Sequence, residues 1–247
     1  MNEGADVRRG FAAIRAVFFD AGATLLHPDP PVEEIYAREF SSGAAARFSP
    51  ADLSRALGLV WAEVQAENRA DRYGGVRGES EFWRRFLNRV RGHLDGGAVS
   101  PEVFGRLAAH FRDPGSWAVF EDVRGTLAEL ELRGVLLAVV SNWDSHLPAL
   151  LEALGLAGSF RAVSVSAIEG TGKPEPEIFR RTCARLGLSP AEVLHVGDSL
   201  VEDYEGARAA GLSALLLDRD GRHAGFSDRL ESLSLLPRIL RGTEIAE

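Results

Sequence analysis

The chain has 247 residues, 45% of them apolar, which is enough for one large domain or two small ones with a buried core. Its net charge is −8 at pH 7 and no block of basic residues interrupts the acidic balance, so we expect no nucleic-acid surface. No apolar run approaches the roughly 20 residues that a membrane span needs, so we expect no membrane segment. Residues 1–10 lack a signal-peptide pattern and predict a loose tail, while the single cysteine, Cys183, excludes an internal disulfide and a cysteine metal cluster. We therefore predict a cytoplasmic protein.

The first predicted element is a buried strand, the apolar run from Ile14 to Phe19, which ends at the carboxylate of Asp20. Parallel sheets bind ligands just beyond the carboxyl ends of their strands, where Asp20 would lie. A carboxylate there can attack phosphorus or carbon as a nucleophile or bind a hard cation, although an Asp can also simply cap the following turn. The proline-rich link at residues 27–31 should then end regular structure.

Residues 32 to about 112 predict helices without an intervening strand. Ser49-Pro50 and Ser100-Pro101 each combine an N-cap residue with a proline at the first helical position, so each should open a helix. Four helices in succession predict a small bundle. The remaining elements of this region are helices at 32–40 and 79–90 and a glycine-containing loop at 72–78.

From Trp117 onward, short apolar segments alternate with amphipathic ones. This alternation is typical of βαβ units and a parallel sheet. The sequence therefore predicts one α/β domain with a helical insert after its first strand. The later strands are expected at 135–140, 162–165, 193–196 and 214–217, and the helices at 123–132, 145–154, 174–186 and 200–210.

Polar or small residues end each predicted strand that precedes a helix, and in a parallel sheet these ends lie along one edge. Carboxylates, a hydroxyl and an ammonium in one cleft suit a phosphoryl group and a Mg²⁺ ion, which prefers carboxylate ligands. Lys173 is the only lysine among 28 lysine and arginine residues, and a compact ammonium fits where the wide arginine fork does not. The residues expected to converge are Asp20, Ser141, Asn142, Lys173, Asp198 and Asp203.

The chain resembles the haloacid dehalogenase superfamily in four motifs that occur in the same order: Asp20-x-x-x-Thr24-Leu25, Ser141-Asn142, Lys173-Pro174 and Gly197-Asp198-Ser199-x-x-x-x-Asp203. The resemblance runs from Ile14 to Leu217 and is especially close from Val196 to Gly211. It implies a Rossmann-like parallel-sheet core at 11–27 and 114–247, with the insert at 28–113 as an α-helical cap of subfamily I. Residues 117–130 and 141–144 resemble the branch of haloacid dehalogenase-like domain-containing protein 3.

This resemblance implies a hydrolase that uses Mg²⁺ and acts on a small phosphate ester. Asp20 would be the nucleophile that forms an aspartyl-phosphate, and Lys173 would steady both the nucleophile and the phosphate. The phosphate would be bound by Thr24, Ser141, Asn142 and Lys173. The ion would be bound by Asp20, the backbone carbonyl of Gly22 and Asp198, with Asp203 either on the ion or behind its ligands.

The chain departs from the family pattern at Gly22, where superfamily phosphatases carry an Asp that protonates the leaving group and activates water. General acid–base catalysis is typically worth roughly 100- to 10,000-fold in rate, so hydrolysis should be slow unless His27, Asp29 or water supplies the acid.

Two alternatives to the phosphatase stay open. One is a non-catalytic family member that binds a phosphorylated ligand or a partner protein. The other is a 2-haloacid dehalogenase, which needs no acid at position 22 because halide leaves without a proton. The metal-binding form of Gly197-Asp198 opposes the dehalogenase, and so does the lack of an arginine soon after Thr24. The sequence names neither the substrate nor the oligomeric state.

Overall fold

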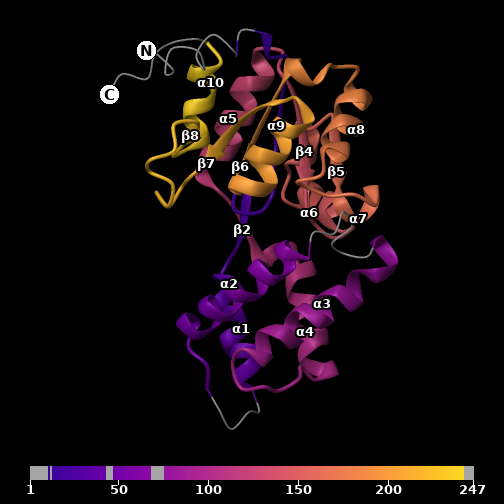
Figure 1. The fold of residues 1–247 in the computed structure, drawn as a ribbon, viewed down its shortest axis with the longest axis vertical. Coiled ribbons are helices and arrows are strands. Elements are labelled where there is room, and N and C mark those ends of the chain that lie inside the picture. Colours follow the sequence, from indigo (N-terminus) through magenta and orange to yellow (C-terminus); the bar gives the residue numbers. More distant parts are fainter. Residues whose placement is uncertain (1–10, 12, 43–46, 68–74, 242–247) are drawn as a thin grey trace.

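The computed structural model describes residues 11, 13–42, 47–67 and 75–241, so the predicted N-terminal tail lies outside the described residues. At its centre is a six-stranded parallel sheet with the strand order β5-β4-β1-β6-β7-β8 (Figure 1). From β1 the chain builds β4 and β5 on one side and then crosses to β6 on the other. The carboxyl end of β1 therefore lies at the switch point where such sheets bind ligands. The strands are β1 (Ala16–Phe19), β4 (Leu136–Ser141), β5 (Ala162–Val165), β6 (Val193–Gly197), β7 (Ser213–Leu217) and β8 (Arg229–Leu230), of which only β8 was not predicted.

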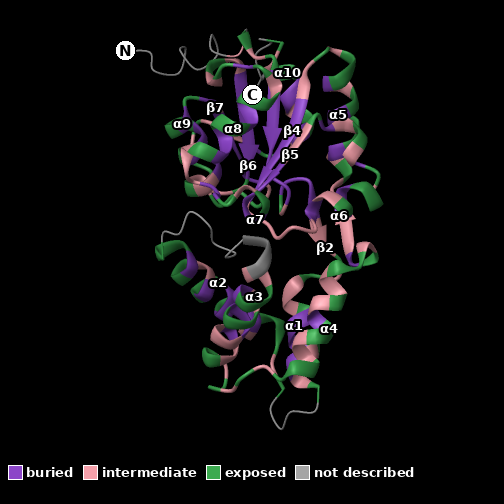
Figure 2. Ribbon diagram, turned by 90° about the vertical axis from the view of Figure 1, so that its right-hand side faces the viewer, coloured by how far each residue is buried: buried purple, intermediate pink, exposed green. Residues whose placement is uncertain are grey.

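Helices cover both faces of the sheet because successive side chains of a strand point to opposite faces. Val17 and Phe19 belong to the hydrophobic cluster under α5, α6 and α10, whereas Ala16 and Phe18 belong to the cluster under α8 and α9. Figure 2 shows the buried residues concentrated in the strands, with exposed residues on the outer sides of the helices. The predicted α/β fold with a Rossmann-like parallel sheet is confirmed. These helices are α5 (Glu121–Leu132), α6 (Leu147–Ala153), α8 (Pro176–Leu186), α9 (Gly206–Ala210) and α10 (Leu236–Ile239).

Within the described residues, the segment inserted after the first strand forms four helices, which share a hydrophobic cluster beyond one end of the sheet (Figure 1). Ser49 and Ser100 cap the second and fourth helices as predicted, because their side chains accept hydrogen bonds from backbone N–H groups in the first turn. The loop predicted at 72–78 is wrong from Gly75 onward, where the third helix has already begun. Glycine lowers helix propensity without excluding a helix. Residues 72–74 lie outside the described residues. The helices are α1 (Val32–Ser41), α2 (Pro50–Ala66), α3 (Gly75–Gly92) and α4 (Pro101–Arg112).

A short antiparallel ribbon joins the helical part to the sheet, with β2 (Leu26–Pro28) paired to β3 (Trp117–Val119). Both passages of the chain between the two parts therefore lie side by side. We expected regular structure to end at residues 27–31, which is wrong for His27 and Pro28. Both belong to β2, because an edge strand tolerates a proline. The predicted boundaries at 27/28 and 113/114 fall in or beside this ribbon and stay a prediction.

Several short turns complete the fold. The predicted helix at 200–210 begins as a π-helical turn, η5 (Leu200–Glu205), before it continues as α9. The turn α7 (Ser166–Glu169), which the sequence did not predict, ends at Gly170 with φ 66°, a left-handed conformation that favours glycine. Among the described residues, no helix is both long and apolar enough to cross a bilayer. Short 3₁₀ turns also lie at Pro114–Ser116, Ala157–Ser159, Pro190–Glu192 and Leu233–Leu235.

Candidate active site

Three carboxylates meet at the carboxyl ends of two neighbouring strands. Asp20 directly follows β1, Asp198 directly follows β6, and Asp203 lies in η5. One oxygen of each carboxylate lies within 4.8 Å of an oxygen of each of the other two. Asp20 and Asp203 are buried whereas Asp198 is exposed, so the cluster meets solvent at Asp198. The strand ends therefore bring these carboxylates together as the sequence predicts.

Lys173 places its ammonium between two of these carboxylates. Its Nζ donates to Asp20 Oδ1 at 2.5 Å and to Asp203 Oδ1 at 2.5 Å, and its side chain is only 2% exposed. Burial by itself lowers the pKa of the lysine, but the charges of Asp20, Asp203 and Glu202 outweigh burial and raise the pKa above its usual range. Lys173 is therefore a cation at neutral pH and lies against Asp20.

Asn142 fixes the backbone that carries Lys173. Its Nδ2 donates to the Lys173 carbonyl at 2.7 Å, and its Oδ1 accepts from the Lys173 N–H at 2.7 Å. The same Nδ2 also donates to Glu202 Oε2 at 2.9 Å. The amide therefore holds the lysine loop in place, and the phosphate contact predicted for Asn142 stays a prediction.

The π-helical turn η5 carries Asp203 into the site. The Asp203 carboxylate accepts from the Ser199 N–H at 2.9 Å, and the Asp203 N–H donates to the Ser199 carbonyl at 3.0 Å. The turn thus closes around its own acidic side chain, and turns of this kind are frequent at functional sites. Gly197 leaves the space for this arrangement, since a Cβ there would lie 2.2 Å from Cγ of Asp203.

The pKa values of the three carboxyl groups differ because their neighbours differ. Burial favours the neutral form of Asp203, but the charge of Lys173 and a hydrogen bond from His195 hold its pKa well below the usual range. Burial and the charge of Asp203 raise the pKa of Asp20 against the lowering effect of the ammonium. Loss of water and repulsion by the other two carboxylates raise the pKa of Asp198 well above its ordinary value.

The two hydroxyls predicted to bind phosphate lie in different surroundings. Ser141, the last residue of β4, is buried and donates a hydrogen bond to Asp20. Thr24 is fully buried, and in the part of the chain that the structure describes its Oγ1 has no hydrogen-bond partner. The Thr24 carbonyl accepts from Arg219 at 2.9 Å, and this guanidinium also forms an ion pair with Asp122. Ser141 therefore lies against the predicted nucleophile, whereas the phosphate contact of Thr24 stays a prediction.

Trp143 fills the space beside Gly22. A Cβ on Gly22 would lie 3.1 Å from Cζ3 of the indole, tighter than ordinary van der Waals contact. The tryptophan is held on both sides: its N–H and carbonyl bond the hydroxyl of Ser166 at 3.2 Å each, and its ring lies 5.1 Å from that of Trp117. The left-handed residue of this turn is Ala23, with φ 53°, and not Gly22. An acidic side chain at position 22 is therefore opposed by the indole and not by the backbone.

The two residues named as alternative acids lie in and next to β2. The ring of His27 packs on Phe120 with centroids 4.6 Å apart, and its Nδ1 faces the carbonyl of Pro28 at 3.0 Å. Asp29 is exposed. Their role as acids stays a prediction.

The donor set fits a Mg²⁺ ion. When all three carboxyl groups are deprotonated, as metal ligands must be, they and the one ammonium sum to a charge of −2, which one divalent cation neutralises. Mg²⁺ takes oxygen ligands and keeps several waters, which the exposed side at Asp198 admits. Asp203 already accepts from Lys173, Ser199 and His195, whereas Asp20 accepts from Lys173 and Ser141, so Asp20 and Asp198 have more oxygen lone pairs to offer. The contact predicted for the Gly22 carbonyl stays a prediction.

Gly206 of α9 supports the loop that carries Lys173. A Cβ on Gly206 would lie 2.8 Å from the backbone Cα of Pro174, the residue after the lysine. We expect Gly206→Ala to destabilise the protein by about 1–3 kcal/mol, because backbone must move to admit the methyl group. Gly58→Ala is the matched control: Gly58 lies exposed inside α2 with nothing within 4 Å of where the added methyl group would lie, so it should gain about 0.5–1 kcal/mol. Urea unfolding measures both, and a Gly206→Ala variant as stable as the wild type would contradict the expected clash.

The fold and the site define a hydrolase of the haloacid dehalogenase-like family, whose family model matches residues 14–211, and the chain belongs to this family. Haloacid dehalogenase-like hydrolase domain-containing protein 3 of Danio rerio is 33% identical over 239 residues, covering 92% of this chain and 97% of the relative. Phosphoserine phosphatase of Thermus thermophilus is 36% identical over 167 residues, or 66% of this chain and 64% of that enzyme. The crystal structure of a HAD phosphatase from Thermococcus onnurineus is similar with a TM-score of 0.61 and 27% identity, over 94% of this chain and 100% of that one.

Two residues of the site were not predicted from the sequence. His195 is a histidine within the apolar run of β6, and this single polar residue in a buried strand was the available signal. Arg219, which holds the Thr24 carbonyl, follows β7 and carries no local signal. Its partners lie 195 and 97 residues away in the chain, so only the fold could reveal the contact.

Proposed function

We propose that the protein is a Mg²⁺-dependent phosphatase that acts on a small phosphate ester through an aspartyl-phosphate on Asp20. One observation carries the proposal: the only lysine of the chain lies 2.5 Å from both Asp20 and Asp203, in a cluster that also contains Asp198. This arrangement orients one carboxylate as a nucleophile and leaves negative charge for a divalent cation. The family match and the phosphatase relative support the same class of reaction.

Asp20, Lys173 and Ser141 each have a task in this reaction. Lys173 and Ser141 hold the carboxylate of Asp20 in one orientation, so that one of its oxygens can attack the phosphorus. A new oxygen–phosphorus bond forms as the bond to the leaving oxygen breaks. The ammonium of Lys173 and the hydroxyl of Ser141 then face the transferred phosphoryl oxygens. Water attacks the phosphorus of the aspartyl-phosphate, which releases phosphate and restores Asp20. Bound Mg²⁺ supplies positive charge that offsets the repulsion between Asp20 and the substrate.

Gly22 and Trp143 are expected to limit which phosphate esters this enzyme turns over quickly. Without a carboxyl group at position 22, the leaving oxygen must depart as an anion or take its proton from water. Poor leaving groups, such as the alkoxides of alkyl phosphates, should therefore turn over slowly. The turnover of aryl phosphates should be reduced less, because their leaving group needs little protonation.

The metal site is tested by calorimetric titration of Mg²⁺ into the wild type and Asp198→Ala. We expect the substitution to weaken Mg²⁺ binding by roughly tenfold or more, since even residues behind a metal ligand are typically worth 10- to 100-fold. Asp220→Ala is the control, because Asp220 is an exposed acid that pairs with Arg222 instead. Equal affinity of wild type and Asp198→Ala would contradict the proposed metal site.

A screen of phosphate esters and a 2-haloacid, each with and without Mg²⁺, separates the phosphatase from its alternatives. Turnover of aryl phosphate that needs Mg²⁺ supports the phosphatase. Release of halide without Mg²⁺ favours the dehalogenase. Mg²⁺ binding without turnover of any compound favours a non-catalytic binding protein.

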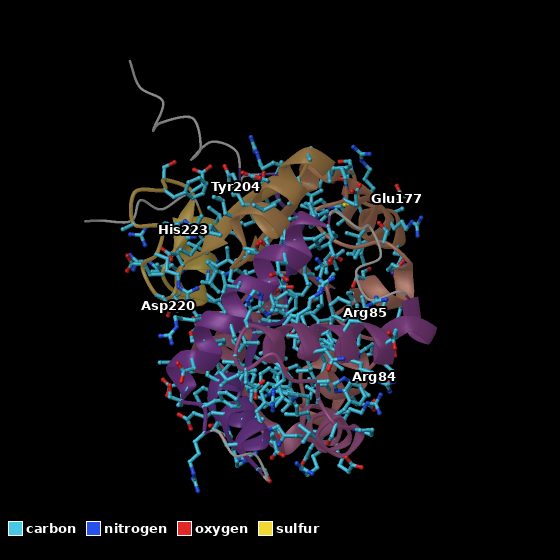
Figure 3. The ribbon with its side chains drawn as sticks, turned by 60° about the horizontal axis from the view of Figure 1, so that its bottom comes forward. Arg84, Arg85, Glu177, Tyr204, Asp220 and His223 are labelled. Atoms are coloured by element: carbon cyan, nitrogen blue, oxygen red, sulfur yellow. The ribbon has the colours of Figure 1, made fainter. Side chains whose placement is uncertain are left out.

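The expected partner is a small-molecule phosphate ester in the cytoplasm, with no nucleic acid or membrane. Seen from the helical end, Arg84, Arg85 and Glu177 lie on one side of the molecule and Asp220 and His223 on the other (Figure 3). Positive and negative side chains thus share one of these sides. The net charge of −8 supports the expectation that the protein has no nucleic-acid surface.

A further inference from the structure

His195 is a fully buried histidine in the middle of β6, where the neighbouring strand residues are apolar. Its ring packs edge-on against Phe179 of α8, with centroids 5.0 Å apart and an angle of 78° between the planes. A buried imidazole needs a hydrogen bond to offset the water that it loses. The partner of this histidine therefore indicates why a polar residue stands in the core.

That partner is Asp203 of the carboxylate cluster. Nε2 of His195 lies 2.8 Å from Asp203 Oδ1. An ionised carboxylate can only accept, so Nε2 carries the proton. Within the described residues Nδ1 is buried without a hydrogen-bond partner, so Nε2 makes the hydrogen bond of this ring. The histidine thus donates to one target, the Asp203 carboxylate.

The oxygen that His195 contacts is the same oxygen that receives Lys173. Asp203 Oδ1 accepts from His195 at 2.8 Å and from Lys173 Nζ at 2.5 Å, while the Asp203 carboxylate also accepts from the Ser199 N–H at 2.9 Å through Oδ2. Three donors from three segments therefore fix the rotation of this carboxylate. Its Oδ1 in turn sets where the lysine ammonium lies relative to Asp20, 2.5 Å away.

The geometry points to His195 as a positioning residue that directs the Lys173 ammonium toward Asp20 by orienting Asp203. Loss of the His195 donor lets the carboxylate rotate and draws Lys173 out of line with the nucleophile. The effect on turnover rests on the proposed phosphatase reaction, whereas the effect on the lysine does not. If His195 has this role, a residue that replaces it must donate a hydrogen bond from the position of Nε2 to keep Lys173 in place. A side chain that only fills the space of the imidazole should not do so.

Two amide side chains provide a matched test. Counted along the side chain, the amide nitrogen of Gln is as far from Cα as Nε2 of histidine, whereas that of Asn is only as far as Nδ1. His195→Gln should therefore restore the donor to Asp203, and His195→Asn should not, although both place a polar amide in the same strand. His195→Leu adds an apolar variant that fills the space without donating.

The readout uses the fact that Lys173 is the only lysine of the chain. Protein labelled with [¹³Cε]lysine gives a single ¹³Cε resonance, which reports the surroundings of the ammonium at fixed pH without any substrate. Turnover of para-nitrophenyl phosphate with Mg²⁺ is measured in parallel. We expect Asn and Leu to shift this resonance and to lower kcat by roughly 10- to 100-fold with KM within about threefold, as for other residues that orient a ligand. Gln should keep the wild-type resonance and a kcat within about fivefold.

Several outcomes overturn the inference. One is a resonance that is the same in wild type, Gln and Asn. Another is an equal loss of kcat in Gln and Asn, which would show that the histidine acts by shape alone. If the wild type turns over no ester, the proposed function fails, but the resonance still decides whether His195 positions the lysine. If Leu does not fold, the Gln and Asn pair decides.

Discussion

Combining Gly22→Asp with Trp143→Leu should raise the turnover of an alkyl phosphate by roughly 10- to 1,000-fold, short of the full range of general acid–base catalysis because the site was not shaped around the new acid. The gain requires both changes. The indole lies 3.1 Å from where the Cβ of residue 22 would be, so Gly22→Asp alone must push the ring aside and should gain less. Smaller side chains at position 143 leave room for the carboxyl group.

The single variants and two substrates separate the effect of the added carboxyl group from the effect of the space that the smaller residue 143 leaves. Trp143→Leu alone enlarges the site without adding a proton donor, so it should not raise alkyl phosphate turnover. An aryl phosphate, whose leaving group needs little protonation, should respond far less than the alkyl ester to the double variant. Thermal melting curves check that each variant is folded, and Mg²⁺ titration checks that the metal site is retained.

A folded, Mg²⁺-binding double variant without any gain would contradict the proposed deficiency at Gly22. High wild-type activity on alkyl phosphates would then mean that another group, such as His27, Asp29 or water, already serves as the acid. No turnover of any ester would mean that the protein binds a phosphorylated ligand or a partner without catalysis.

The second large effect is expected at Lys173, where even a substitution that keeps the positive charge should lower turnover. Lys173 is 2% exposed and lies 2.5 Å from two carboxylates, so the wider guanidinium of Lys173→Arg does not fit. Overpacking of a buried site costs typically about 1–3 kcal/mol. The displaced cation would no longer face Asp20 and the phosphate, and turnover should fall by roughly 100-fold or more, as when one charge-stabilising donor is removed.

Lys173→Met removes the charge and leaves Asp20 and Asp203 buried without their cation, which should destabilise the protein by about 3–5 kcal/mol. Because Lys173 holds the pKa of Asp203 below its usual range, the wild type loses the stability of this pair as the pH falls through that lowered pKa. In Lys173→Met the carboxyl group of Asp203 protonates more easily. The difference in free energy of unfolding between the wild type and Lys173→Met should therefore become smaller at acid pH.

Urea unfolding at neutral and acid pH measures the stability differences, and para-nitrophenyl phosphate measures turnover. Arg55→Lys, at an exposed ion pair with Asp52, is the control and should change stability by less than about 0.5 kcal/mol. Full activity of Lys173→Arg would show that the ammonium is not placed as we propose.

The order of the elements could be predicted from the sequence because it depends on local patterns. The apolar run of β1 ends at Asp20, and glycine closes several of the later helices. Serine followed by proline opens α2 and α4. Once alternation indicates a parallel sheet, the polar residues after its strands must share one edge, and this placed Asp20, Ser141 and Asp198 together without coordinates.

The sequence by itself therefore determined which residues meet at the strand ends, while only the tertiary structure decided how they contact one another. Lys173 and Asp20 are 153 residues apart, and the bond between them depends on a loop that Asn142 and Gly206 hold in place. The indole beside Gly22 comes from the loop after β4, and the imidazole beside Asp203 comes from β6. Such contacts arise when side chains from distant segments pack to fill a common space, and this packing leaves no periodic signal in the chain.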